Sequence, residues 1–321
     1  MDAWAAQAGR RLRTGARAKS RRWSRMDRRT TLIRGRPPTE KEIAVTANSA
    51  KPNPADTVVL IHGLWMTPLS WEHWVKRYTD RGYRVIARGW PGMDGDIEQL
   101  RRDPSALAGL GVSQIVEHYE RIIRELEQPP IIMGHSFGGL FTQILLDRGL
   151  GAAGVAIASA PVKGVLLLPF STLKVSFPAL SNPANLHKAA PLTPEQFHYA
   201  FTNHLSEEES RKVFERYAVP GPDHVLFQAG LANLNPHAET TVNFRNDGRA
   251  PLLFIAGGKD HISPPSLTEM NYRLYKKSKA ITDYREFPNR THFILGQPGW
   301  EEVADYALDW ATQHIGATPR V

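Results

Sequence analysis

The chain has 321 residues, of which 41% are apolar and 22% charged, and it contains no cysteine. This length allows one large domain or two ordinary ones, and the balance excludes a wholly disordered chain, a collagen-like repeat and a disulfide-stabilised scaffold. The absence of cysteine also excludes a thiol nucleophile and a cysteine-bound zinc, and no apolar run reaches the roughly 18 residues of a transmembrane helix.

The positive charge is concentrated at the start of the chain. The formal net charge is +8, but residues 1–40 hold twelve Arg and Lys against three acidic residues, so the remainder has a net charge of −1. Such a charge block is typical of a solvated extension, and we predict a basic, disordered segment over residues 1–45. Binding of nucleic acid or an anionic membrane by this segment is the alternative. The near-neutral body itself predicts no nucleic-acid partner.

Targeting signals are incomplete in the same segment. Arg21-Arg22 resembles a twin-arginine export signal, and the arginine-rich, acid-poor start resembles an organelle transit peptide. No apolar region follows the arginine pair, so we expect a cytoplasmic protein and leave export and organelle targeting open.

Predicted strands and helices alternate over residues 46–160. The strands are short apolar runs that end in turn residues, and the helices have apolar residues spaced three or four apart. The predicted order is strand 57–61, helix 71–78, strand 83–87, helix 112–126, strand 130–133, helix 140–146 and strand 155–158. This alternation predicts the α/β class, with a mostly parallel sheet covered by helices on both faces.

The alternation is interrupted over residues 161–248. This segment is rich in Pro and Asn, shows no clear strand, and starts helices with capping sequences at Thr193 and Ser206. Beyond it we predict a strand over 251–256, a helix over 265–277, a strand over 281–287 and a helix over 300–314. We therefore expect a mainly helical insertion at 161–248, and a core built from residues 46–160 and 249–321.

A candidate nucleophile follows the strand at 130–133. The sequence Gly134-His135-Ser136-Phe137-Gly138 lies between that strand and the next helix, the context in which a G-x-S-x-G pattern has catalytic meaning. A tight turn there exposes the Ser136 hydroxyl at the carboxyl end of the sheet. The start of the following helix offers free N–H groups to a developing anion.

A serine nucleophile needs a base and an orienting carboxylate, and the later strands supply candidates for both. His292 lies in the loop after the strand at 281–287, and Asp260 follows Gly257-Gly258 after the strand at 251–256. His62, beside Gly63, is predicted to order its own turn by hydrogen bonding. Asp94 and Asp96 come too early in the chain for the acid, although either could line the site.

The order Ser136, Asp260, His292 resembles that of the α/β-hydrolase superfamily. The resemblance covers about residues 56–160 and 249–315, and it places the insertion where that superfamily carries a lid. It implies an oxyanion hole formed by the backbone N–H groups of Leu64 and Phe137, because His62-Gly63-Leu64-Trp65 looks like the superfamily's oxyanion loop. The serine disfavours relatives that use an aspartate at the elbow, namely haloalkane dehalogenases and epoxide hydrolases.

We predict an apolar substrate pocket, a serine hydrolase and no cofactor. The candidate pocket residues are large and apolar, although packing of the lid on the core explains most such side chains: Trp65, Met66, Trp71, Phe170 and Phe177. No phosphate-binding, dinucleotide-binding or metal-ligand motif is present.

The expected reaction is cleavage of a carboxylic ester with an apolar acyl or alcohol group, such as a lactone or an acylglycerol, through an acyl-enzyme. The alternatives are acyltransfer, C–C bond hydrolysis or perhydrolysis by the same triad, and a non-catalytic ligand-binding protein on the same fold. The partner is then a small-molecule ester, and the sequence leaves the oligomeric state open.

Overall fold

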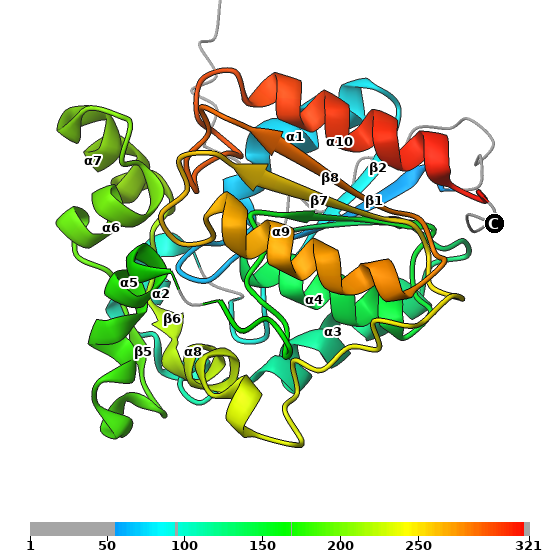
Figure 1. The fold of residues 1–321 in the computed structure, drawn as a ribbon. Coiled ribbons are helices and arrows are strands. Elements are labelled where there is room, and N and C mark those ends of the chain that lie inside the picture. Colours follow the sequence, from blue (N-terminus) through cyan, green and yellow to red (C-terminus); the bar gives the residue numbers. More distant parts are fainter. Residues whose placement is uncertain (1–54, 94–95, 168, 318–321) are drawn as a thin grey trace, which may run out of the picture. The chain divides into compact units, whose positions relative to one another are not determined.

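The computed structural model describes residues 55–93, 96–167 and 169–317, so the predicted basic extension over 1–45 lies outside the described residues. Its centre is a six-stranded sheet in the order β2-β1-β3-β4-β7-β8, in which every neighbouring pair is parallel (Figure 1). The strands are β1 (Thr57–Ile61), β2 (Arg84–Ala87), β3 (Ile131–His135), β4 (Ala153–Ile157), β7 (Leu252–Gly257) and β8 (Thr282–Phe287). The predicted α/β class and parallel sheet are confirmed.

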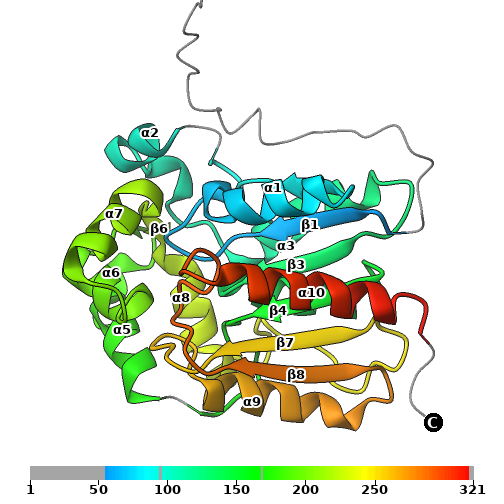
Figure 2. The same ribbon diagram turned by 90° about the horizontal axis from the view of Figure 1, so that it is seen from above.

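Helices cover both faces of this sheet (Figures 1 and 2). One face carries α1 (Glu72–Asp80) and α10 (Trp300–His314), and the other carries α3 (Val112–Arg124), α4 (Phe137–Asp147) and α9 (Pro265–Leu274). Successive side chains of a strand point to opposite faces. In β1, Val58 and Leu60 therefore join the core under α1 and α10, whereas Val59 and Ile61 join the core on the other side.

A group of helices lies between β4 and β7 in the chain, beyond the carboxyl ends of the strands (Figure 1). Its helices are α5 (Phe170–Leu180), α6 (Pro194–Phe201), α7 (Glu207–Tyr217) and α8 (Asp223–Gly230). We keep the name lid, which the family resemblance suggests, for residues 161–248, which contain these helices. The lid also holds an antiparallel pair, β5 (Ala189–Ala190) and β6 (Gly221–Pro222), where the sequence showed no strand. Two residues are too few to produce a recognisable alternation of side chains.

Short helices complete the described chain. Helix α2 (Ile97–Arg102), which we did not predict, is capped by Asp96, whose side chain accepts a hydrogen bond from Gln99 N–H. The 3-10 helices are η2 (Pro68–Trp71), η3 (Ser105–Leu107), η4 (Pro183–Asn185), η5 (Ala232–Leu234) and η6 (Tyr275–Lys277). Across the residues that the structure describes, no helix has both the length and the apolar character to cross a membrane.

Candidate active site

Ser136 occupies a strained turn between β3 and α4. Its backbone has φ 56° and ψ −119°, a conformation that residues with a Cβ atom rarely adopt. Hydrogen bonds hold the turn on both sides, because Ser136 N–H donates to the carbonyl of Ile157 at 2.9 Å and the Ser136 carbonyl accepts from Ala160 N–H at 2.9 Å. Backbone strain of this kind persists only where the surrounding structure fixes it, which is common at functional sites.

Two glycines make the turn sterically possible. A Cβ atom on Gly134 would lie 2.0 Å from the carbonyl oxygen of Gly138, and a Cβ atom on Gly138 would lie 2.0 Å from the carbonyl oxygen of Ile61. Both distances are far below van der Waals contact, and both involve backbone atoms. The glycines of the G-x-S-x-G pattern are thus required by the close approach of α4 to β3 and β1.

Asp260 and His292 form a buried hydrogen-bonded pair at the ends of β7 and β8. Nδ1 of His292 lies 2.7 Å from Oδ2 of Asp260, and both side chains are fully buried. The other carboxylate oxygen accepts the backbone N–H groups of Ile262 at 2.7 Å and Ser263 at 2.8 Å. Since a carboxylate at Nδ1 favours the tautomer that carries its proton there, Nε2 of His292 is left as the acceptor.

The neighbouring His135 connects the His292 loop to the serine turn. Its Nε2 atom lies 2.8 Å from the carbonyl oxygen of His292, and the two ring centroids are 4.6 Å apart. Burial, together with the nearby His292, holds the pKa of His135 well below its ordinary value, so the His135 ring is neutral at pH 7. Within the described chain, Nε2 of His292 has no hydrogen-bond partner and no hydrogen bond joins it to Ser136. Catalytic hydrogen bonds often tighten only when substrate binds.

The backbone N–H groups of Leu64 and Phe137 are free of protein acceptors in the described structure. Phe137 is the first residue of α4, where helical geometry leaves N–H groups unpaired. Leu64 follows His62-Gly63, and His62 orders that turn as predicted, with Nδ1 2.9 Å from the Gly63 carbonyl oxygen. Both Leu64 and Phe137 line the same cavity as Ser136.

That cavity has a volume of about 240 Å³ and lies between the sheet and the lid. The core contributes Leu64 and Phe137, and the lid contributes residues of α5 and α8 such as Leu173 and Leu226. Leucine, valine and alanine side chains predominate, and no charged residue lines the cavity. Such a site suits an uncharged ligand with an apolar portion.

The five predicted pocket residues have different surroundings. Trp65 lines the cavity, whereas Met66 is buried in the adjacent core. Trp71 does not line the cavity, because it packs against Trp74 in the core under α1 and α10, on the other face of the sheet. Phe170 and Phe177 do not line it either, and their side chains are 80% and 60% exposed.

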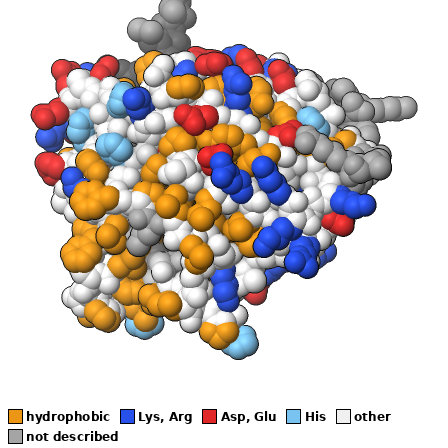
Figure 3. Space-filling model, viewed as in Figure 1, with side chains coloured by type: hydrophobic (Ala, Val, Ile, Leu, Met, Phe, Trp, Pro, Cys, Tyr) orange, Lys and Arg blue, Asp and Glu red, His pale blue; other side chains and the backbone are white. Residues whose placement is uncertain are grey.

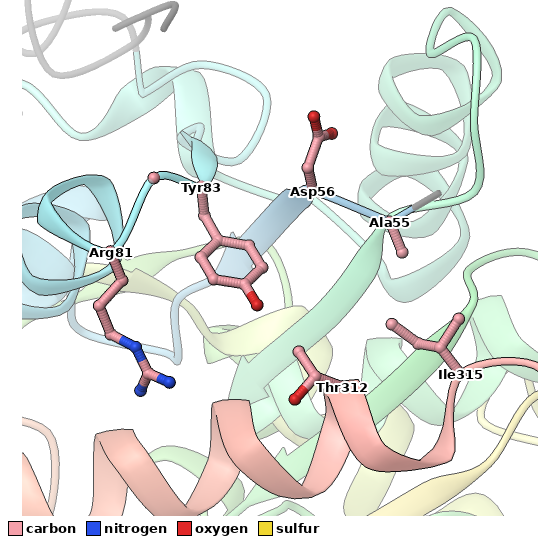
Figure 4. A pocket seen from close by; sticks show the side chains of 7 residues that line it. Ala55, Asp56, Arg81, Tyr83, Thr312 and Ile315 are labelled. Carbon is pink, nitrogen blue, oxygen red and sulfur yellow. The ribbon is translucent and has the colours of Figure 1, made fainter. Parts of the chain in front are cut away.

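A second hollow, of about 320 Å³, lies at the opposite ends of the strands (Figure 4). Asp56 and Tyr83 line it just before the starts of β1 and β2, with Thr312 near the end of α10. In α/β sheets, ligands bind at the carboxyl ends of the strands, which here carry Ser136, Asp260 and His292. In the described ranges, no cluster of three His, Asp or Glu side chains is arranged to hold a metal ion.

Comparison with known proteins points to one family. A sequence model described as the alpha/beta hydrolase family matches residues 58–306, which is more than half of the chain. An uncharacterized abhydrolase domain-containing protein from Dictyostelium discoideum is 24% identical over 278 residues. The match covers 83% of this chain but 27% of that relative, so this chain spans about a quarter of its length.

Solved structures share the fold. A monoacylglycerol lipase from Paleococcus ferrophilus superposes with a TM-score of 0.56 at 20% identity, covering 83% of this chain and 98% of that one. Tomato methylketone synthase I, in complex with 2-tridecanone, superposes with a TM-score of 0.58 at 14% identity, covering 81% and 99%. The differing names of these two proteins illustrate that this fold alone does not fix the reaction.

Proposed function

Because the chain belongs to the alpha/beta hydrolase family, we propose that it is a serine hydrolase that cleaves uncharged carboxylic esters. The buried Asp260–His292 pair carries this proposal. Its hydrogen bond leaves Nε2 of His292 as an acceptor, and the His292 carbonyl is hydrogen-bonded to the ring of His135, the residue beside Ser136. Ser136 in turn lines the uncharged cavity.

In the proposed mechanism, Ser136 Oγ attacks the ester carbonyl while His292 Nε2 takes its proton. The backbone N–H groups of Leu64 and Phe137 stabilise the oxyanion, and Asp260 stabilises the imidazolium that forms. The C–O bond then breaks, and His292 gives its proton to the leaving alcohol. A water molecule, deprotonated by His292, attacks the acyl-enzyme. The bond between the acyl carbon and Ser136 Oγ then breaks, His292 returns the proton to Oγ, and the carboxylic acid is released.

The cavity indicates the class of substrate. Its lining contains no cationic residue that would pair with a carboxylate or phosphate on the substrate. Its volume of about 240 Å³ and its leucine-rich wall suit an apolar acyl or alcohol group of medium size. The similar fold of a protein named as a monoacylglycerol lipase is consistent with an acylglycerol or a related ester.

The test is replacement of the nucleophile. We expect Ser136→Ala to lower kcat for p-nitrophenyl esters by about 10⁴–10⁶ and to abolish labelling by a fluorophosphonate. Ser105→Ala, at an exposed serine of η3, is the matched control and should change neither readout.

Two outcomes contradict ester hydrolysis. If Ser136 is labelled but no ester in a chain-length series is hydrolysed, the triad serves acyltransfer, C–C bond cleavage or perhydrolysis instead. If neither labelling nor turnover occurs, the chain is a ligand-binding protein.

A further inference from the structure

Large apolar side chains are exposed together on the lid. In the described part of the chain, every exposed leucine and phenylalanine lies in residues 166–177 or residues 231–234. Leu166 is 73% exposed, Phe170 80% and Leu234 81%. Figure 3 shows apolar side chains gathered over α5 and α8, which contact each other. We call residues 166–167, 169–177 and 231–234 the lid patch. A concentration of exposed apolar side chains of this kind usually marks an interaction site.

The lid patch is continuous with the cavity beside Ser136. Leu166, Leu167 and Leu173 line that cavity and are also exposed to solvent. The cavity therefore opens within the lid patch. An apolar molecule that entered from a surface covering the patch would reach Ser136 without crossing water.

The sequence within and next to the lid patch carries basic but no acidic side chains. No Asp or Glu occurs from Arg148 to Pro194, nor from Leu226 to Ala238. Lys174 lies within the patch, and Lys163 contacts the segment that follows Leu234 through the carbonyls of Asn235 and Pro236. Neither lysine forms an ion pair with a described carboxylate, and the Lys174 ammonium lies 3.8 Å from the centre of the Tyr199 ring. Long lysine side chains reach from an apolar surface to a polar boundary.

We propose that the lid patch docks on a phospholipid surface and that the cavity draws apolar substrate from it. Leucine and phenylalanine side chains would enter the acyl region, while the two lysines would meet the phosphate groups that phospholipid headgroups carry. A lipid surface fits both the apolar centre and the absence of acidic side chains from the patch segments, and it explains why the cavity opens there. This docking is a property of the surface and does not depend on turnover at Ser136.

The experiment is co-sedimentation of the full chain with phosphatidylcholine vesicles. Neutral lipid is used because the twelve Arg and Lys of residues 1–40 would themselves bind anionic vesicles. We expect the wild type to bind, and Phe170→Glu/Leu234→Glu to lower its partition coefficient by at least about 10-fold, because the burial of two apolar side chains is lost and two charges are added. The milder Phe170→Ser/Leu234→Ser should show an intermediate loss.

The matched control adds the same two charges elsewhere. Ala108→Glu/Gln313→Glu alters exposed positions outside the lid and should bind as the wild type does. Ser136→Ala should also bind normally, which separates docking from ester hydrolysis. Equal binding of the wild type and the patch variants, or no binding by any of them, overturns the proposal. It is also overturned if the patch variants abolish a dimer of the wild type in sedimentation without changing vesicle binding.

Discussion

At the scale of single residues, the orientation of His292 depends on the carboxylate of Asp260. One carboxylate oxygen is hydrogen-bonded to the imidazole of His292, and the other accepts hydrogen bonds from the backbone N–H groups of Ile262 and Ser263. The side chain therefore cannot rotate without breaking three hydrogen bonds. A buried arrangement of this kind fixes both the position and the tautomer of the imidazole that we propose as the base.

Replacement of that carboxylate by an amide tests the arrangement. In Asp260→Asn the amide oxygen can still accept the hydrogen bonds from the N–H groups of Ile262 and Ser263. The NH₂ group of the amide then faces Nδ1 of His292 and selects the wrong imidazole tautomer. We expect kcat for a p-nitrophenyl ester to fall by about 10³–10⁴ with little change in KM. Asp96→Asn, which keeps a good cap on α2, should leave kcat within about twofold. Normal turnover in the Asp260 variant would assign the acid role to another residue.

At the scale of elements, the lid is attached to the core through helix α7. Glu72 at the start of α1 accepts hydrogen bonds from Arg216 Nε at 2.7 Å, from a second nitrogen of Arg216, and from Tyr217 at 2.5 Å. Although burial alone would raise it, hydrogen bonds from these two residues lower the pKa of Glu72. The ring centroids of Tyr217 and Phe293 are 5.5 Å apart, so this contact links the lid to the loop that carries His292.

We expect Glu72→Gln to lower the free energy of unfolding by about 1 kcal/mol, because the amide loses the charge-assisted bonds to Arg216. The effect is modest because Arg216 is half exposed and water screens the pair. Urea unfolding at low and at high salt measures it, and the difference from the wild type should shrink at high salt. Glu208→Gln, which breaks an exposed pair with Lys212 on the same helix, should have almost no effect. Equal losses in the two variants would mean that Glu72 does not attach the lid.

The sequence predicted the elements of the sheet well but not the surroundings of single side chains. The buried strands are continuous apolar runs that end in turn residues, so their positions agree with the structure within about two residues. Helical spacing showed that Trp71 is buried, but it does not show on which face of the sheet the helix packs. The sequence indicates Phe170 and Phe177 as pocket candidates because they are large and apolar and lie in the insertion. Their exposure depends on how α5 lies against the cavity, which no local pattern encodes.

At the scale of the whole molecule, three buried groups make stability depend on pH. Burial lowers the pKa of His62 from 6.5 to about 4 and that of His135 well below 6.5. Burial raises the pKa of Asp223 in the lid from 3.8 to about 6, and one of its oxygens has no hydrogen-bond partner among the described residues. The folded state thus disfavours protonation of the two histidines and favours protonation of the aspartate.

Between pH 6 and pH 4.5, these pKa shifts have opposite effects on the free energy of unfolding. There the unfolded chain binds protons at His62 and His135 that the folded chain does not bind, so the free energy of unfolding falls as the pH falls. Asp223 is protonated only in the folded state and opposes this fall. The net difference of about one proton corresponds to a loss of at most about 1.4 kcal/mol per pH unit from these groups.

Asp223→Asn removes the opposing group, so the decline of the free energy of unfolding on acidification should become steeper by up to about 1.4 kcal/mol per pH unit, which corresponds to one proton. Urea unfolding of the wild type and of this variant at pH 7, 6, 5 and 4.5 gives both slopes directly. An Asp223 variant whose slope matches that of the wild type would show that this carboxyl is already ionised in the folded protein. A wild type whose stability stays constant from pH 7 to 4.5 would show that the two buried histidines accept protons without unfolding.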